Sequence, residues 1–431
     1  MVSALYIVGI DTINQLIVHI RSMLAFTLVG PSSSGAIYPP ARQRRCEMRL
    51  TGVEFLRFSA QHSNATRNWM LVKLLTDDPR LFGIGDASAM QNDTEVMGII
   101  NGWFSRYLEG RDPLDSEVIW ATLYHDTSAR GGRLATTALS GIDIALWDLK
   151  GKILGQPVYK LLGGAHRRQL RVYANGWYTN PGSPEQNASE ARDVVAKGYT
   201  ALKFDPFGQG HYYTIPAAEA KLAEERVAAV RAAVGDEVEI LIEAHAKFAP
   251  TTAIQLGRRL EKYRPYWYEE PVAQERIEEL KLVRASVNIA IAAGERLYTK
   301  FPFAALVEQE AVDIIQPDIA HAGGITELKK IAAIAEAKHV LLAPHNVCSP
   351  VGAMATIQLG MSCINFLFLE YHAEFYSDHY FTVASGFPRQ EGGYVQIEDT
   401  PGLGLVVNED EIAKHPPLKT VSASGGKIKG I

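Results

Sequence analysis

Six acidic or imidazole side chains stand at the ends of apolar, β-rich runs in the C-terminal half of the chain. They follow one another at intervals of 23 to 27 residues. In chain order they are Glu243, Glu269, Glu295, Asp318, His345 and Glu370. One strand, one helix and their loops take about this length of chain. The spacing therefore predicts that the six side chains meet at one edge of a parallel sheet.

The first three of these carboxylates favour a bound metal ion. Adjacent carboxylates raise each other's proton affinity, and a divalent cation removes their repulsion. Ligation by oxygen alone favours magnesium over zinc. We therefore expect Mg²⁺ to be held by Glu243, Glu269 and Glu295. Glu270 also follows a strand, but Glu269 keeps the equal steps of 26 residues to its neighbours.

The elements that position these side chains alternate between strand and helix. Eight β-rich runs are separated, in most cases, by amphipathic helical segments, and this alternation predicts a closed parallel barrel whose active site lies at the carboxyl ends of the strands. The runs cover residues 171–175, 201–205, 238–245, 266–271, 289–295, 312–318, 340–346 and 366–372. The interval from Lys203 to Glu243 is unusually long, so the stretch GQGHYYTIP is expected to be a loop inserted near the site.

The region before the barrel divides into two parts. Residues 1–47 contain Pro, Ser and Arg clusters typical of a linker. We expect an extension without a catalytic role, either disordered or an overlong start with Met48 as the first residue; a targeting peptide is the alternative. From residue 48 to about 76 the pattern is that of strands, and from 93 to 164 it is helical. These residues predict an α+β unit.

Composition excludes several classes of protein. The formal net charge of −5 argues against binding to nucleic acid. The sequence contains no run of about 20 uncharged apolar residues, the length needed to span a membrane. The three cysteines are too few for a disulfide framework or a zinc cluster and favour a reducing compartment, so we expect a cytoplasmic protein. Nucleotide-binding and zinc-peptidase motifs are not found.

Several motifs together carry a resemblance to a known family. GIDIALWDLKGKILGQPVYKLLGG, EEP, AAGER, QPDIAHAGGITE, APHN and PGLGLVV occur in this order. They resemble the enolase superfamily, mandelate racemase subgroup, and are most similar to acid-sugar dehydratases of the gluconate and galactonate type. The resemblance implies a (β/α)7β modified TIM barrel over residues 171–384. It also implies an α+β capping domain, formed by residues 48–170 and a returning C-terminal segment, 385–431.

The same resemblance suggests roles for five further residues. His345 matches the general base of the family, and Asp318 matches the acid that orients and charges it. His245 matches a general acid that protonates the departing C3 hydroxyl; on an extended chain it would face the same side as Glu243 two residues earlier. Glu370 and Lys203 match residues that hold the substrate carboxylate.

The function implied is a magnesium-dependent elimination of water from a small-molecule sugar acid, in a homo-oligomer. Asp205 stands where racemases of the family carry a second lysine, which favours elimination over racemisation. An epimerase, racemase or cycloisomerase on the same scaffold is the alternative enzymatic hypothesis, because fold does not determine reaction. A non-catalytic barrel protein is the third hypothesis, and the retained polar residues at the strand ends count against it.

Overall fold

The computed structural model describes residues 48–61, 66–89, 91–125, 132–376 and 379–419. The extension expected over residues 1–47 lies outside the described residues. Within the described residues, no helix combines the length and the apolar character needed to cross a membrane.

The first part of the chain folds as an antiparallel sheet covered by helices. Its strands lie in the order β1 (Leu50–Gln61), β2 (Thr66–Thr76) and β3 (Phe82–Asp86). The helices that follow are α2 (Asp93–Trp103), η1 (Phe104–Leu108), α3 (Ser116–His125), α4 (Arg133–Leu154) and α5 (Val158–Leu161). Helix α4 approaches β3 closely because Gly83 and Gly85 have no side chain. A Cβ at either glycine would lie 2.0 Å from a carbonyl oxygen of α4.

The second part alternates strands with helices. The strands are β4 (Leu170–Ala174), β5 (Ala201–Phe204), β6 (Glu239–Glu243), β7 (Trp267–Glu269), β8 (Ala290–Ala293), β9 (Ile314–Ile315), β10 (Leu341–Leu342) and β11 (Leu369–Tyr371). The helices between them are α6 (Pro184–Ala196), α7 (Ala217–Val234), α8 (Pro250–Leu260), α9 (Ile277–Arg284), α10 (Lys300–Glu308), α11 (Gly324–Glu336) and α12 (Pro350–Ser362), with the short η2 (Glu261–Tyr263) after α8. Seven of these strands lie within runs predicted from the sequence, and β4 begins one residue before its predicted run, 171–175.

These strands form the barrel that the sequence predicts. The order is β10-β9-β8-β7-β6-β5-β4-β11, and all these neighbours are parallel. The amide of Leu367, just before β11, donates to the carbonyl of Leu342 in β10 at 2.7 Å, which links the two outer strands. A buried cluster fills the interior with one residue from or beside each strand, so the barrel is a packed core. The (β/α)7β architecture with a capping domain is confirmed.

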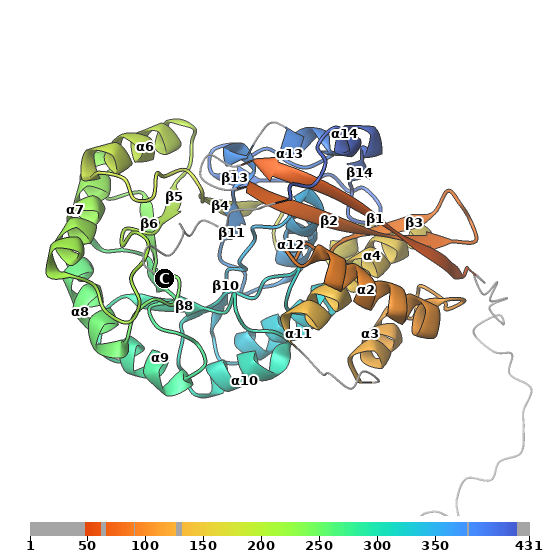
Figure 1. Cartoon of the computed structure of the whole chain (residues 1–431), viewed down its shortest axis with the longest axis horizontal. Coiled ribbons are helices and arrows are strands. Elements are labelled where there is room, and N and C mark those ends of the chain that lie inside the picture. Colours follow the sequence, from red (N-terminus) through yellow and green to blue (C-terminus); the bar gives the residue numbers. More distant parts are fainter. Residues whose placement is uncertain (1–47, 62–65, 90, 126–131, 377–378, 420–431) are drawn as a thin grey trace, which may run out of the picture. The chain divides into compact units, whose positions relative to one another are not determined.

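The C-terminal segment returns to both parts of the molecule. Strand β13 (Tyr394–Val395) pairs with β4, while β12 (Ala384–Ser385) pairs with β14 (Val406–Val407). Figure 1 shows the blue helices α13 (His379–Thr382) and α14 (Glu409–Ala413) beside the orange strands β1 and β2. The Ser59 amide of β1 donates to the His415 carbonyl at 2.9 Å. The residue boundaries given above for the domains stay predictions.

Helix α4 of the capping domain docks on the amino end of α11 in the barrel. The carboxylate of Asp143 accepts hydrogen bonds from the backbone amide of Thr326 at 2.9 Å and from its hydroxyl at 2.5 Å. Gly324 permits this approach: its φ is +76°, and a Cβ there would lie 2.4 Å from Oδ2 of Asp143. The contact between α4 and α11 therefore requires a glycine at position 324.

We expect Gly324→Ala to destabilise the protein by about 2 kcal/mol or more, because it adds a steric clash to a left-handed backbone. Thermal unfolding checks this result. Gly155→Ala is the matched control, since Gly155 also has a positive φ, +63°, with nothing within 4 Å of the added Cβ. Equal losses in the two variants would show that backbone strain alone, and not the contact with Asp143, is responsible.

Candidate active site

Each side chain predicted for the site lies at or just after the carboxyl end of a barrel strand. Glu243 and Glu269 are the last residues of β6 and β7, and Lys203 and Glu370 lie within β5 and β11. The others follow strand ends: His245 after β6, Glu295 after β8, Asp318 after β9 and His345 after β10. The even spacing in the sequence thus corresponds to one edge of the barrel.

A cavity of about 470 Å³ opens at this edge. Five of the predicted residues line it: Lys203, Glu243, His245, Glu295 and His345. The other three, Glu269, Asp318 and Glu370, are buried behind the lining. Each of these three contacts a lining residue directly, so the structure brings the whole predicted set together.

Three carboxylates form a cluster that could hold a metal ion. Glu243, Glu269 and Glu295 each present an oxygen within 4.8 Å of the others. Burial and the charge of Glu243 raise the pKa of Glu269 well above its ordinary value, against the opposing effect of Lys203. Burial and the repulsion between Glu243 and Glu269 therefore oppose ionisation of Glu269. A divalent cation would supply compensating positive charge, and oxygen donors suit a hard cation.

Lys203 lies among the buried carboxylates. Its Nζ is 2.7 Å from Glu269, 3.0 Å from Glu370 and 3.4 Å from Glu243. Although burial opposes its charge, Glu269 and Glu370 raise its pKa well above the ordinary value. Lys203 is therefore a fixed cation beside the cluster.

Glu370 is fully buried and does not line the cavity. Oε1 accepts from the side-chain amide of Asn175 at 2.6 Å, and Oε2 accepts from the backbone amide of Asn346 at 2.7 Å. Although burial opposes its ionisation, Lys203 and His345 lower its pKa to about 2. Glu370 is therefore an ionised carboxylate that holds Lys203, and it reaches a ligand in the cavity only through its neighbours.

His345 and Asp318 form a hydrogen-bonded pair. Nδ1 of His345 lies 2.6 Å from Oδ2 of Asp318, and Nε2 lies 3.4 Å from Glu295. Burial disfavours the imidazolium, but Glu295 and Asp318 together raise the pKa of His345 to about 9. With Nδ1 bonded to the buried carboxylate, Nε2 is the ring nitrogen left to exchange a proton.

His245 belongs to a second pair of the same kind. The extended chain assumed from the sequence ends at Glu243, and His245 has a positive φ of 53°. Its Nδ1 lies 2.9 Å from Oδ2 of Asp205, which is buried and also binds the ammonium of Lys247. The sequence analysis notes Asp205 only because racemases of the family carry a lysine at this position. That Asp205 is the partner of His245 is seen only in the structure.

Other residues at the cavity were not predicted as site residues. Arg296 pairs with both Glu270 and Glu295, and so holds two carboxylates in place. His321 and His372, which the sequence analysis did not assign to the site, line the cavity as well. The expected inserted loop lies between β5 and α7 and contributes Gln209, Gly210, His211 and Tyr212 to the lining, so it does border the site.

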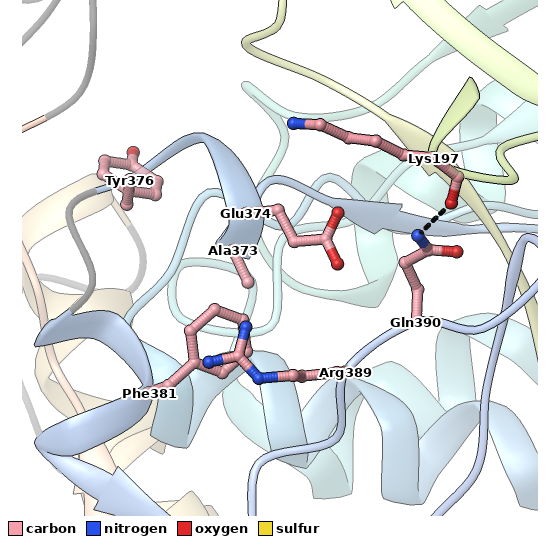
Figure 2. A pocket seen from close by; sticks show the side chains of 7 residues that line it. All are labelled: Lys197, Ala373, Glu374, Tyr376, Phe381, Arg389 and Gln390. Carbon is pink, nitrogen blue, oxygen red and sulfur yellow. Dashed lines mark hydrogen bonds between the residues drawn. The ribbon is translucent and has the colours of Figure 1, made fainter. Parts of the chain in front are cut away.

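A separate hollow is lined by Lys197, which follows α6, and by residues between 373 and 390. Figure 2 shows its lining, in which Lys197 and Arg389 flank Glu374, and Gln390 donates to the backbone carbonyl of Lys197 at 2.9 Å. Tyr376 is shared with the larger cavity, but none of the predicted catalytic or metal-binding residues lines this hollow. The candidate active site is therefore the cavity at the strand ends.

Comparison with known proteins agrees with this geometry. Residues 56–163 match the mandelate racemase/muconate lactonizing enzyme N-terminal domain, and residues 186–411 match the enolase C-terminal domain-like family. A D-gluconate dehydratase of Thermoproteus tenax is 38% identical over 80% of this chain and 69% of its own. A D-galactonate dehydratase of Variovorax paradoxus is 34% identical over 81% of this chain and 92% of its own.

Solved structures show the same fold. The crystal structure of a mandelate racemase/muconate lactonizing enzyme from Jannaschia sp. CCS1 superposes with a TM-score of 0.80 at 32% identity, covering 86% of this chain and 98% of that one. The similarity therefore extends over the capping domain and the barrel together. The chain belongs to the mandelate racemase/muconate lactonizing enzyme family of the enolase superfamily.

Proposed function

We propose that this protein is a magnesium-dependent acid-sugar dehydratase. It removes the C2 proton of an acid sugar of the gluconate or galactonate type and eliminates the C3 hydroxyl, giving a 2-keto-3-deoxy acid. One observation carries the proposal: two histidines, each held by its own buried carboxylate, face one cavity beside a cluster of three carboxylates. Relatives named gluconate and galactonate dehydratases support the substrate class.

The donor set fits magnesium. Glu243, Glu269 and Glu295 would hold the ion through carboxylate oxygens, which Mg²⁺ prefers. When bound, the ion would stabilise the negative charge that develops on the substrate carboxylate as C2 loses its proton. Lys203, fixed by Glu269 and Glu370, supplies a second positive charge beside that carboxylate.

His345 is proposed as the base. Against the effect of burial, the charge of Glu295 raises the pKa of His345 to about 9, and a cation held by Glu295 would offset that charge and favour the neutral ring. Nε2 of the neutral ring accepts the C2 proton, while Asp318 binds the other ring nitrogen and stabilises the imidazolium that forms. The hydrogen bond of 2.8 Å from the Ala320 amide to Asp318 holds that carboxylate in place.

His245 is proposed as the acid. It donates a proton to the C3 hydroxyl as the C–O bond breaks, so that water leaves and an enol remains, which rearranges to the 2-keto acid. In the strand order, β6 and β10 are separated by three strands, so the two histidines lie on opposite sides of the barrel axis. The C2 proton and the C3 hydroxyl would then leave from opposite faces of the substrate.

Racemisation is the less favoured reaction on this scaffold. It requires a second base opposite His345, which must return a proton to C2. The position of that base holds Asp205, whose carboxylate is fully buried and bound to His245 and Lys247. The carboxylate of Asp205 therefore orients His245, does not line the cavity, and is not placed to act as a second base.

A panel of aldonates and aldarates, assayed for 2-keto acid formation with and without Mg²⁺, tests the proposed function. We expect the acids of one stereochemical series to form 2-keto acids, and we expect chelation of the metal to stop this reaction. Racemisation of substrate without any 2-keto product would overturn the proposal.

The second histidine separates the two chemical steps. We expect His245→Asn to lose dehydration by about 100-fold or more, yet to keep exchanging the C2 hydrogen with deuterated solvent, because His345 is intact. Asp205→Asn should show the same pattern more weakly, since it removes only the orientation of His245. Proton NMR of recovered substrate measures the exchange. Loss of exchange in His245→Asn would mean that this residue, and not His345, is the base.

Two further properties belong to the same proposal. The few cysteines of the sequence, with Cys348 and Cys363 both unpaired and buried, suit a reducing compartment, and we propose that the enzyme works in the cytoplasm. We also propose a homo-oligomer, as the resemblance to the family implies. Light scattering of the purified protein measures its assembly state.

A further inference from the structure

Five lysine and arginine residues line the active-site cavity, and they fall into two groups. Three are paired with carboxylates: Lys203 with Glu243, Glu269 and Glu370, Lys247 with Asp205, and Arg296 with Glu270 and Glu295. The charges of this group are compensated by the protein itself.

The other two are Arg67 and Arg133. Across the described part of the chain, neither guanidinium has a carboxylate within 4.0 Å or a side-chain hydrogen bond. Both side chains are half-buried, and Nε of Arg67 is shielded from solvent without a hydrogen-bond partner. A buried polar group without a partner is costly, and a buried charge more so. Their charges are therefore available to a ligand.

Both arginines belong to the capping domain. Arg67 lies near the start of β2, and Arg133 is the first residue of α4. One turn after Arg133, the hydroxyl of Thr137 lies 2.8 Å from Nδ1 of His321, which also lines the cavity. Residues four apart share a helix face, so the face of α4 that carries Arg133 is turned to the cavity.

Where Arg67 and Arg133 line the cavity, the positive charge comes from these two arginines and not from His321. Burial lowers the pKa of His321, and Arg133 adds to that effect against the opposing charge of Asp318. The imidazole is thus neutral near pH 7. Two like charges at one cavity repel each other, and sugar hydroxyls could accept hydrogen bonds from them but would not neutralise them. A carboxylate can accept hydrogen bonds from the two guanidinium groups and can also neutralise their charge, and its planar shape matches the guanidinium group.

We propose that the substrate is a sugar diacid, whose second carboxylate is bound by Arg67 and Arg133 while the first lies beside the carboxylate cluster. This inference rests on the proposed dehydration: it keeps the carbon configuration of the gluconate or galactonate type but places a carboxylate where those monoacids have the C6 hydroxymethyl group. Arg67 and Arg133 are then specificity-determining residues.

Matched substrate pairs test the inference. Gluconate and glucarate, or galactonate and galactarate, share the configuration of every stereocentre and differ only at C6, which is a hydroxymethyl group in one and a carboxylate in the other. We expect kcat/KM to be about 100-fold higher for the diacid of the reactive pair, because a buried charge pair contributes on this scale. Gluconate 6-phosphate, in a third arm, separates recognition of a carboxylate from recognition of phosphate.

Two variants connect the preference to the arginines. In Arg67→Gln and Arg133→Gln, the ratio of kcat/KM for the diacid over the monoacid should fall by at least about 10-fold, mostly through KM. Arg106→Gln is the matched control, since Arg106 is exposed on η1 and does not line the cavity. The ratio should not change in this control.

The outcomes distinguish the inference from the proposed function. A monoacid that reacts faster than its diacid, or a ratio unaltered in both arginine variants, overturns the diacid inference and leaves the dehydratase in place. Faster turnover of the 6-phosphate overturns the assignment of a carboxylate. Failure of every acid sugar, with either end group, would count against the dehydratase itself.

Discussion

His345→Asn should abolish both dehydration and exchange of the C2 hydrogen with solvent. The side chain keeps a similar shape but has no nitrogen that can accept a proton. Its partner Asp318 is fully buried and lies behind the imidazole, so it cannot reach the substrate in its place. General-base catalysis contributes about 10²–10⁴-fold, and we expect a loss near the upper end because no second base faces C2.

Reaction in deuterium oxide, followed by proton NMR of substrate and product, measures both activities in one sample. His339→Asn serves as the control, since His339 is exposed and lies outside the cavity. Exchange that persists in His345→Asn but disappears in His245→Asn would reverse the assignment of acid and base.

Glu269→Gln and Glu295→Gln should each lower metal-dependent turnover by about 1,000-fold or more. Each replacement removes a negative charge and one oxygen donor from a cluster in which the three carboxylates approach within 4.8 Å. A bound cation contributes several kcal/mol through charge stabilisation, and about 4 kcal/mol corresponds to this factor. Weaker binding of Mg²⁺ should accompany the loss of activity.

Calorimetric titration with Mg²⁺ and circular dichroism separate lost metal binding from lost folding. Glu278→Gln, an exposed glutamate of α9, is the matched control and should behave as the unmodified protein. Full activity in both Glu269→Gln and Glu295→Gln would show that the metal, if one is required, is held elsewhere.

The barrel and its active edge could be predicted because the same unit recurs along the chain. A parallel strand and its helix take a nearly constant length, so side chains at the ends of successive strands are also evenly spaced. Glu243, Glu269 and Glu295 follow this rule, and their oxygens meet in the structure. Local patterns suffice for this part of the site, because each strand end contributes its residue independently.

Other contacts could not be predicted, because they join elements whose relative positions depend on the whole fold. His245 and Asp205 are 40 residues apart, and their contact requires a turn after β6 with positive φ at a histidine. No sequence period marks that turn. Arg67 and Arg133 come from two separate elements of the capping domain, and only their packing over the barrel places them at one cavity.

The packing of the C-terminal segment on β1 and β2 has a consequence for synthesis. Lys73 of β2 pairs with Glu409 of α14, 336 residues later, and the whole barrel is translated between them. Chains emerge from the ribosome at about 5–20 residues per second, so the capping sheet waits tens of seconds for this partner. The barrel strands from β4 to β10, each close in sequence to its neighbour, can assemble during that time, whereas β11 must return to β4. The capping sheet therefore gains this contact only after all the barrel strands have been synthesised.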